Sequence, residues 1–170
     1  MSPAMGSVLL IDFEAHQHGD EPFHVKELCV ISASQPLKPL YYLFKSKQSW
    51  SSLSIQQKRT YCYQEHHLHH LAWNEGNERY CANCLFEDII ERFPLATLPE
   101  AKCYVIGKQK ADFLQEQLPQ LNIYEYANSF KDVPNDAPSH LTCSYRNHSR
   151  DHCATLKCYR MYEQYCLNKF

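Results

Sequence analysis

Two acidic side chains near the start of the chain are spaced so that they can hold a divalent cation. Asp12 and Glu14 end the largely apolar run SVLLIDFEA, whose pattern predicts a central β-strand over residues 7–15. Residues two apart in a strand point to the same side, so both carboxylates face one way. Carboxylate pairs of this kind bind the metals of hydrolytic sites. A solvated strand end without a metal is the alternative interpretation, because acids at strand ends are common.

A second group of chemically capable residues lies near the other end of the chain. The stretch CSYRNHSRDHCATLKC, residues 143–158, contains three cysteines, two histidines and an aspartate. Thiolate and imidazole together suit zinc, and structural zinc sites use four such ligands in a tetrahedron. The alternative is packing without a metal, with Cys153 and Cys158 as small buried side chains and His148 and His152 exposed in a loop.

One acid in a predicted apolar strand also needs a partner. The stretch FHVKELCVIS predicts a strand over 23–32, and we expect one of its faces to carry Glu27 among apolar residues, namely Phe23, Val25, Cys29 and Ile31, with Leu28 and Val30 on the other face. An unpaired carboxylate buried there would cost several kcal/mol. Zinc coordination would satisfy Glu27 and cross-link the fold, which can contribute roughly 10 kcal/mol.

The elements that must position these residues follow from the hydrophobic pattern. We expect strands over 7–15, 23–32, 40–45, 101–107 and 121–126, and helices over 49–70, 78–93, 108–118 and about 151–168. Three leading strands followed by strands that alternate with helices predict an α/β fold with a mixed five-stranded sheet flanked by helices. This is the order of elements in the RNase H-like fold.

Composition limits the class of protein. A chain of 170 residues with 44% hydrophobic and 21% charged residues fits a single domain over 1–170. Nine cysteines exclude a complete intramolecular disulfide framework, and we expect an intracellular setting, cytoplasmic or nuclear. No stretch approaches the roughly 20 apolar residues that cross a bilayer, so we expect no membrane association. The net charge of −2 gives no overall attraction to nucleic acid, although a local basic patch remains open.

The chain resembles the DEDDh exonucleases, which have the RNase H-like fold. Asp12 and Glu14 match the D-x-E motif that this family carries on its first strand. The stretch VIGKQKADFL puts Lys110 where the family has its second-motif aspartate, and HCATLK puts His152 on the third-motif histidine and Lys157 on its aspartate. An ammonium group repels the cation that an acid would bind, so the resemblance implies that two-metal hydrolysis is lost or rebuilt.

The alternative is an active nuclease. In it Asp12 and Glu14 would hold Mg²⁺ or Mn²⁺ with a substitute acid, for which the candidates are Asp112, Asp132 and Asp151.

The chain also resembles the Maelstrom domain, an RNase H-like domain with a degenerate acidic site and a Glu-Cys-His-Cys zinc site. Its Cys-His-Cys part is similar to Cys143, His148 and Cys153, which are followed by Ala154. The resemblance therefore implies a structural zinc held by these three residues and Glu27. Four residues separate Cys143 from His148, where the family often has two, so His152 stays an alternative ligand. Cys158 is an alternative to Glu27.

A group of insect mobile-element-associated proteins shows a similar pattern over nearly the whole chain. Its K-E-L strand, its glycine–lysine helix start and its terminal Cys-His-Cys-Ala pattern are matched by Lys26–Leu28, Gly107–Lys110 and Cys143–Ala154. These resemblances imply a setting of piRNA-type transposon silencing or mobile elements.

A second cysteine and histidine cluster occupies residues 62–84. It contains Cys62, His66, His67, His69, His70, Cys81 and Cys84. We interpret the segment HHLAWNEG within it as a structural junction between loop and helix, with a second metal site as the alternative.

We expect the chain to bind single-stranded RNA, using Lys108, Lys110, Arg146 and Arg150 to neutralise phosphates while tyrosines stack on bases. The sequence thus predicts a zinc-stabilised, catalytically degenerate exonuclease-like domain. Two alternatives remain, the active nuclease and a protein-interaction domain that does not bind nucleic acid.

Overall fold

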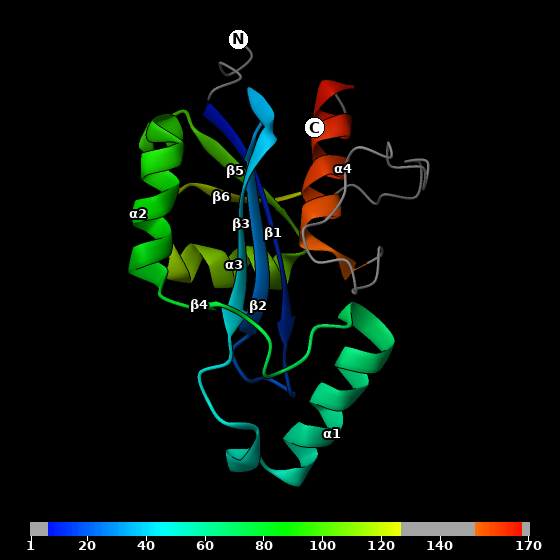
Figure 1. Ribbon diagram of the computed structural model, residues 1–170. Helices are drawn as coiled ribbons and strands as arrows, with labels where there is room; N and C mark the ends of the chain where they lie inside the picture. Colours follow the sequence, from blue (N-terminus) through cyan, green and yellow to red (C-terminus); the bar gives the residue numbers. More distant parts are fainter. Residues whose placement is uncertain (1–6, 127–151, 168–170) are drawn as a thin grey trace.

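The computed structural model describes residues 7–126 and 152–167, which form an α/β fold around one mixed sheet (Figure 1). The six strands are β1 (Val8–His16), β2 (His24–Ser32), β3 (Gln35–Lys45), β4 (Glu78–Arg79), β5 (Lys102–Ile106) and β6 (Ile123–Tyr126). They lie in the order β4-β3-β2-β1-β5-β6. β2 runs antiparallel to β1 and β3, while β5 is parallel to β1 and β6.

The prediction of five strands was short by one. The additional strand, β4, has two residues and pairs with the end of β3 through Phe44↔Glu78 and Lys45↔Arg79. It lies in a segment predicted to be helical, because α2 begins only at Ala82. Two residues are too few to show strand alternation in the sequence, so tertiary pairing alone defines this strand.

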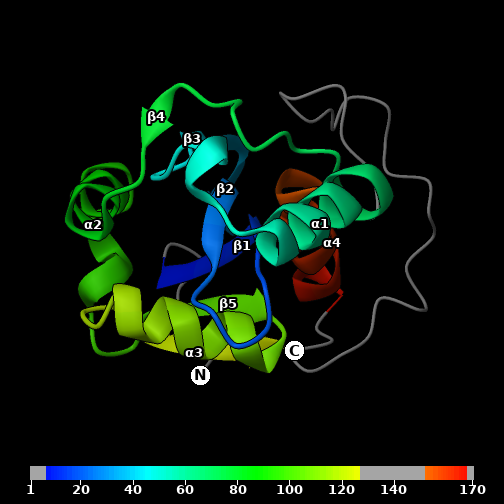
Figure 2. The same cartoon turned by 90° about the horizontal axis from the view of Figure 1, so that it is seen from below.

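Helices cover both faces of the sheet. The helices α2 (Ala82–Arg92) and α3 (Lys108–Gln117) lie on one face and α4 (Ala154–Cys166) on the other, while α1 (Ile55–Gln64) lies beyond one end of the sheet (Figures 1 and 2). None of the helices among the described residues is long and apolar enough to cross a bilayer.

The central strand β1 separates two hydrophobic cores. Leu9, Ile11 and Phe13 pack with α2 and α3, whereas Val8 and Leu10 pack against α4. This confirms the prediction of a central strand that is apolar on both faces. Asp12 and Glu14 continue the row of Val8 and Leu10, so they lie on the α4 face of the sheet.

A register shift in β2 changes which residues share a face. Glu14 pairs with Glu27 but Ala15 pairs with Val25, so Lys26 has no partner on β1. Val25 therefore belongs to the core under α2 and α3, while Cys29 and Ile31 pack against α4. The expectation that Val25 and Glu27 share a face was wrong, because one extra residue in a strand reverses the alternation that follows it.

The segment around α1 forms a small separate cluster. Ser54 caps α1 and exchanges hydrogen bonds with Gln57, and the helix ends in a π-helical turn over Glu65–His69. Trp73 stacks on Tyr61 with ring centroids 4.8 Å apart. A Cβ on Gly76 would lie 2.3 Å from the carbonyl carbon of Phe44, so only glycine fits there. These contacts support the interpretation of this segment as a structural junction.

Candidate functional site

The two predicted lysines meet the two predicted acids at one place. Lys110, in the first turn of α3, lies 3.0 Å from Asp12 Oδ1 and 3.9 Å from Glu14 Oε1. Lys157, on α4, lies 2.8 Å from Glu14 Oε1 and 3.9 Å from Asp12 Oδ2. Asp12 is fully buried and Glu14 is 6% exposed. These four side chains, which we call the lysine–acid quartet, bring β1, α3 and α4 together.

The charges of the quartet cancel. Burial would lower the pKa of Lys157, but the carboxylates of Asp12 and Glu14 outweigh burial and raise that pKa above its usual value. Lys110 also donates a hydrogen bond to the carbonyl oxygen of Phe13, on the strand between the two acids. Lys157 is therefore positively charged at neutral pH, and both ammonium groups are bound to specific oxygens.

This arrangement opposes binding of a catalytic metal. A divalent cation between Asp12 and Glu14 would have to displace both ammonium groups or lie beside them, where it would be repelled. Asp112, a substitute acid in the active-nuclease alternative, is exposed on α3. The other two substitutes, Asp132 and Asp151, lie outside the described residues. The ion pairs of the quartet can hold β1 against α3 and α4, but both of its carboxylates are already engaged by lysines and are not free to bind a metal.

The start of α4 holds the predicted zinc residues that the structure describes. Glu27 is fully buried, and its Oε1 accepts a hydrogen bond of 2.7 Å from the backbone N–H of Ala154. Its Oε2 accepts one of 2.8 Å from the hydroxyl of Tyr41. Cys153 is the N-cap of α4, and its Sγ accepts from the N–H of Leu156 at 3.5 Å. Glu27 and Cys153 thus lie together at a helix N-terminus, which favours negative charge.

The donor types at this position fit zinc in part. A buried carboxylate and a buried sulfur both accept hydrogen bonds from the first turn of α4, and zinc takes ligands of both kinds. Cys143 and His148 lie outside the described residues, and His152 is half-buried just before α4. Among the described residues no three His, Cys, Asp or Glu side chains are placed to hold a metal. The hydrogen bonds to Glu27 also provide partners for its burial that do not require a metal.

Cys158 is not placed to replace Glu27. Its Sγ donates toward the carbonyl oxygens of Cys29 and Leu10, at 3.3 Å and 3.6 Å, inside the core under α4. Burial raises the pKa of this thiol well above its usual value. A neutral thiol that donates to backbone carbonyls is a packing residue. The alternative in which Cys158 replaces Glu27 as a zinc ligand was therefore wrong.

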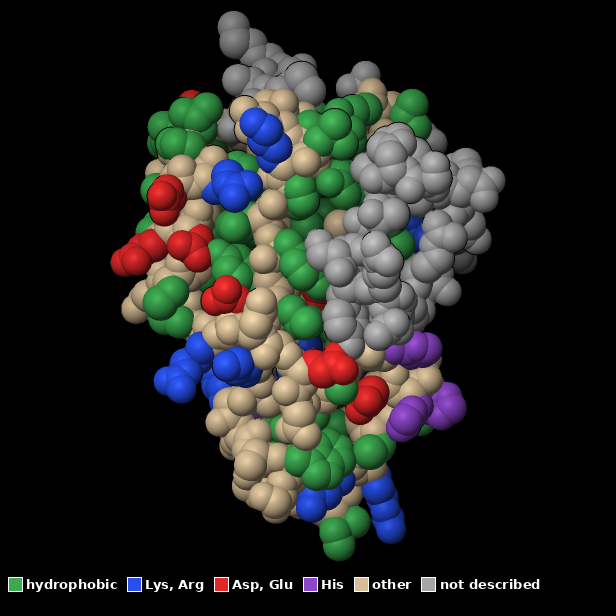
Figure 3. Space-filling model, viewed as in Figure 1, with side chains coloured by type: hydrophobic (Ala, Val, Ile, Leu, Met, Phe, Trp, Pro, Cys, Tyr) green, Lys and Arg blue, Asp and Glu red, His purple; other side chains and the backbone are tan. Residues whose placement is uncertain are grey.

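The cysteine and histidine cluster of residues 62–84 divides into separate parts. His66, His67 and His70 are exposed around the π-helical end of α1, and Figure 3 shows histidine side chains at the surface at lower right. His69 is buried against His16, with ring centroids 4.6 Å apart. Cys81 and Cys84 pair with each other at the start of α2. No group of three or more metal-binding side chains forms in this part of the described chain.

Lys26 is a buried lysine, and the alternating pattern of its strand did not predict its burial. The side chain is fully buried, and Nζ donates to the carbonyl oxygens of Phe44, Trp73 and Glu75, with 2.7 Å to the first and 3.0 Å to the second. Burial lowers the pKa of this ammonium to about 8. The K-E-L match in the sequence singled out Lys26, but an alternating pattern carries no signal for a buried lysine.

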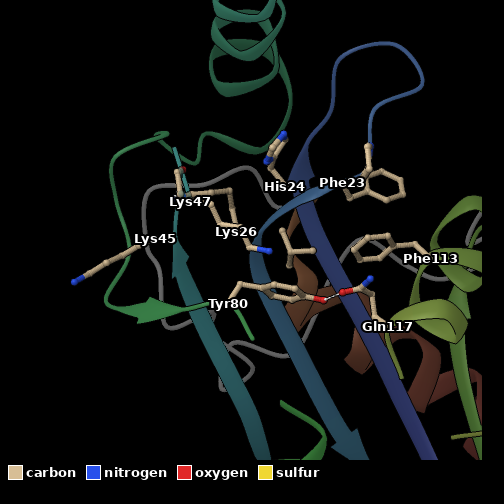
Figure 4. Close-up of a pocket in the computed structure, with 11 residues that line it drawn as sticks. Phe23, His24, Lys26, Lys45, Lys47, Tyr80, Phe113 and Gln117 are labelled. Carbon is tan, nitrogen blue, oxygen red and sulfur yellow. Dashed lines mark hydrogen bonds between the residues drawn. The ribbon is translucent and has the colours of Figure 1, made fainter. Parts of the chain in front are cut away.

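A hollow of about 190 Å³ lies beside Lys26, at the ends of β2 and β3 (Figure 4). Its walls include the rings of Phe23, Phe113 and Tyr80, and Lys45 and Lys47 lie at its rim. Lys47 Nζ lies 5.0 Å from the centroid of the Tyr80 ring. Figure 3 shows lysine and arginine side chains gathered over the β3–β4 end of the sheet. We call this feature the aromatic hollow.

The predicted RNA-binding residues differ in availability. Lys110 is engaged in the quartet, so its charge is already neutralised by Asp12 and Glu14. Lys108 is exposed at the start of α3. Arg146 and Arg150 lie outside the described residues. Lys45 and Lys47 were missed because two lysines in a loop-flanking position are an ordinary surface pattern, and only the fold places both at the rim of the hollow, with Lys47 over the Tyr80 ring.

Comparison of the chain with protein-family models, with curated proteins and with solved structures gives no match. The geometry of the described residues therefore carries the functional interpretation.

Proposed function

We propose that this chain is a Maelstrom-like domain of RNase H-like fold that has lost two-metal hydrolysis and binds single-stranded RNA. The observation that supports the loss is the lysine–acid quartet. Lys110 and Lys157 occupy the places where the exonuclease pattern has acids, and both contact the remaining acids Asp12 and Glu14.

The sheet supports the fold part of this proposal. Three antiparallel strands are followed by two parallel strands that connect through α3, and the order of these five is β3-β2-β1-β5-β6. That is the arrangement expected from the order of elements in the RNase H-like fold. The acids at the end of the central strand and a helix packed across them, α4, also fit the degenerate-nuclease proposal.

The aromatic hollow supports the binding part. Single strands bind where cations meet the phosphates and aromatic rings stack on the bases. Lys45 and Lys47 at the rim supply the cations, and Phe23, Tyr80 and Phe113 supply the rings. The setting in transposon silencing or mobile elements belongs to the same proposal and rests on the sequence resemblance.

A structural zinc completes the proposal, with Glu27, Cys143, His148 and Cys153 as its ligands. The support is the position of Glu27 beside Cys153 at the start of α4. Zinc there would fix α4 to β2. Elemental analysis of the purified chain should find about one zinc per chain. A chain that contains no metal and keeps its melting temperature in chelator would overturn this part.

The loss of hydrolysis is tested with labelled single-stranded RNA and DNA in Mg²⁺ or Mn²⁺. We expect no cleavage by the wild type above a buffer control. Cleavage that disappears in Asp12→Ala would show that the acids are catalytic and would overturn the proposal. In the reverse direction, the Lys110→Asp, Lys157→Asp double variant should bind Mn²⁺ in a calorimetric titration under conditions in which the wild type does not.

RNA binding is tested by filter binding of a single-stranded RNA across a series of salt concentrations. The affinity should fall with salt, with a slope of about −0.7 for each phosphate neutralised. The Lys45→Ala, Lys47→Ala double variant should bind more weakly and with a shallower slope. Lys38→Ala, on an exposed position of the same strand away from the hollow, is the matched control and should bind like the wild type. No binding at low salt would favour the protein-interaction alternative.

A further inference from the structure

Two cysteines at the start of α2 form a close pair that the proposed function does not use. Cys81 is the N-cap of the helix and Cys84 follows one turn later. The Cys84 thiol donates to Cys81 Sγ with the sulfurs 2.8 Å apart, and the Cys84 backbone N–H donates to the same sulfur at 3.3 Å. Cys84 is exposed and Cys81 partly so. The pair is therefore accessible to a small molecule in solution.

The two thiols are electrostatically different. Hydrogen bonds from the Cys84 thiol and backbone lower the pKa of Cys81, and the same thiol contact raises the pKa of Cys84. The N-terminus of α2 favours a negative sulfur at Cys81. Glu87, further along α2, opposes this effect without outweighing it. Cys81 is thus suited to be the attacking thiolate, and Cys84 the thiol that stays protonated until it is needed.

We propose that Cys81 and Cys84 are a redox-active dithiol, oxidised to an intramolecular disulfide by low-molecular-weight disulfides of the glutathione class. The Cys81 thiolate attacks one sulfur of the small disulfide, whose S–S bond breaks and releases one thiolate. Cys84 then loses its proton and attacks Cys81 Sγ, which releases the second thiolate. The two leaving thiolates take up the two protons. The dithiol loses two electrons and the small disulfide gains them, so the exchange balances.

A redox role fits this pair better than a metal role. In the described part of the chain no third histidine, cysteine or acid joins the two sulfurs in a metal-binding group. Two cysteines in the cores, Cys103 and Cys158, are protected from oxidation, because burial raises the pKa of Cys103 to about 12 and that of Cys158 well above its usual value. The pair at α2 combines access, closeness and a lowered pKa.

The test uses the wild-type chain in buffers of defined ratios of glutathione to glutathione disulfide. Trypsin cleaves after Arg79 and Arg92, so both cysteines fall in one peptide, residues 80–92, that contains no other cysteine. After alkylation of free thiols, mass spectrometry should show this peptide without alkyl groups and two hydrogens lighter in the oxidising buffers. If the peptide stays doubly alkylated even in excess glutathione disulfide, the proposal is wrong.

Two variants assign the roles. Cys84→Ser should accumulate a glutathione adduct on Cys81, because no thiol remains to release it. Cys81→Ser should form an adduct on Cys84 at least tenfold more slowly than Cys84→Ser does on Cys81. Cys166, exposed at the end of α4, is the internal comparator and should react as slowly as Cys84 in the Cys81→Ser variant. Equal rates at Cys81 and Cys166 would overturn the proposal. So would a metal in the wild type that both variants lose.

Discussion

A buried and a half-buried lysine in this molecule show two ways to hold an ammonium group. Lys26 is surrounded by the carbonyl oxygens of Phe44, Trp73 and Glu75, and burial lowers its pKa to about 8. Lys157 contacts the carboxylates of Asp12 and Glu14, which raise its pKa despite burial. Carbonyl dipoles position a cation, but full negative charges offset its lost hydration more completely. The comparison predicts different responses to mutation and to pH at the two places.

The largest effect should come from removing one cation of the quartet. Lys157→Met leaves two buried carboxylates with only Lys110, which should lower the free energy of unfolding by about 4 kcal/mol at pH 7. Denaturant unfolding measures this loss. Adding Glu14→Gln to Lys157→Met should restore most of it, because the uncompensated charge is removed. A double variant no more stable than Lys157→Met would contradict the ion-pair interpretation.

Removing Lys26, which is held by carbonyl oxygens, should lower the free energy of unfolding somewhat less than removing Lys157. Lys26→Met leaves buried carbonyl oxygens without a donor but leaves no buried charge, so we expect a loss of about 3 kcal/mol. The measurement is again denaturant unfolding at pH 7. A loss larger than that of Lys157→Met would reverse the comparison.

The pH dependence distinguishes the two lysines further. Above pH 8 folded Lys26 releases its proton while the unfolded lysine keeps it up to about pH 10.5, so this group favours folding more as pH rises. The stability of the wild type relative to Lys26→Met should therefore increase by about 3 kcal/mol between pH 8 and 10.5. A constant difference over that range would exclude the lowered pKa.

A buried imidazole extends the comparison to acid pH. His16 Nε2 donates to the carbonyl oxygen of Leu71 at 3.0 Å, and burial together with His69 and Lys26 lowers its pKa to about 2. Below pH 6.5 His16 is protonated in the unfolded chain but stays neutral in the folded protein, so the free energy of unfolding falls as pH falls. The wild type should lose about 2 kcal/mol more than His16→Asn between pH 6.5 and 5. Parallel curves for the two proteins would contradict this.

The smallest effect concerns a single neutral donor to a buried anion. Tyr41→Phe removes the hydroxyl that donates to Glu27 Oε2 and leaves the hydrogen bond from the Ala154 N–H in place. We expect a loss of about 1 kcal/mol in thermal or denaturant unfolding. Tyr42→Phe on the same strand, whose hydroxyl donates to Asp88 at an exposed site, is the control and should cost less.

The sequence predicted the parts of the site that depend on local pattern. Asp12 and Glu14 share a face because strands alternate, whereas Lys110 and Lys157 were singled out by the resemblance to the exonuclease motifs. The meeting of these four residues also depends on the order of the strands within the sheet, for which the hydrophobic pattern predicted only a mixed sheet.

Other features depend on contacts between residues far apart in the sequence, and the local sequence pattern does not indicate them. The unpaired position of Lys26 in β2 moves Val25 to the opposite face, and nothing in FHVKELCVIS marks a bulge there. Three of the partners of Lys26 are backbone carbonyls, which are independent of side-chain identity, and the fourth is the hydroxyl of Ser46 at 3.4 Å. The predicted ligands Cys143 and His148 lie outside the described residues, so the complete zinc set stays a prediction.

The quartet has a consequence for the order in which the protein is assembled. Glu14 and Lys157 are 143 residues apart in sequence, and Glu27 and Ala154 are 127 apart. During synthesis β1 and β2 leave the ribosome long before α4. Until α4 is made, nothing from that helix covers their acids or the apolar row of Val8, Leu10, Cys29 and Ile31. Contacts of such sequence separation form slowly. The nascent chain therefore exposes one face of its sheet until α4 emerges, and that face is where a chaperone would bind.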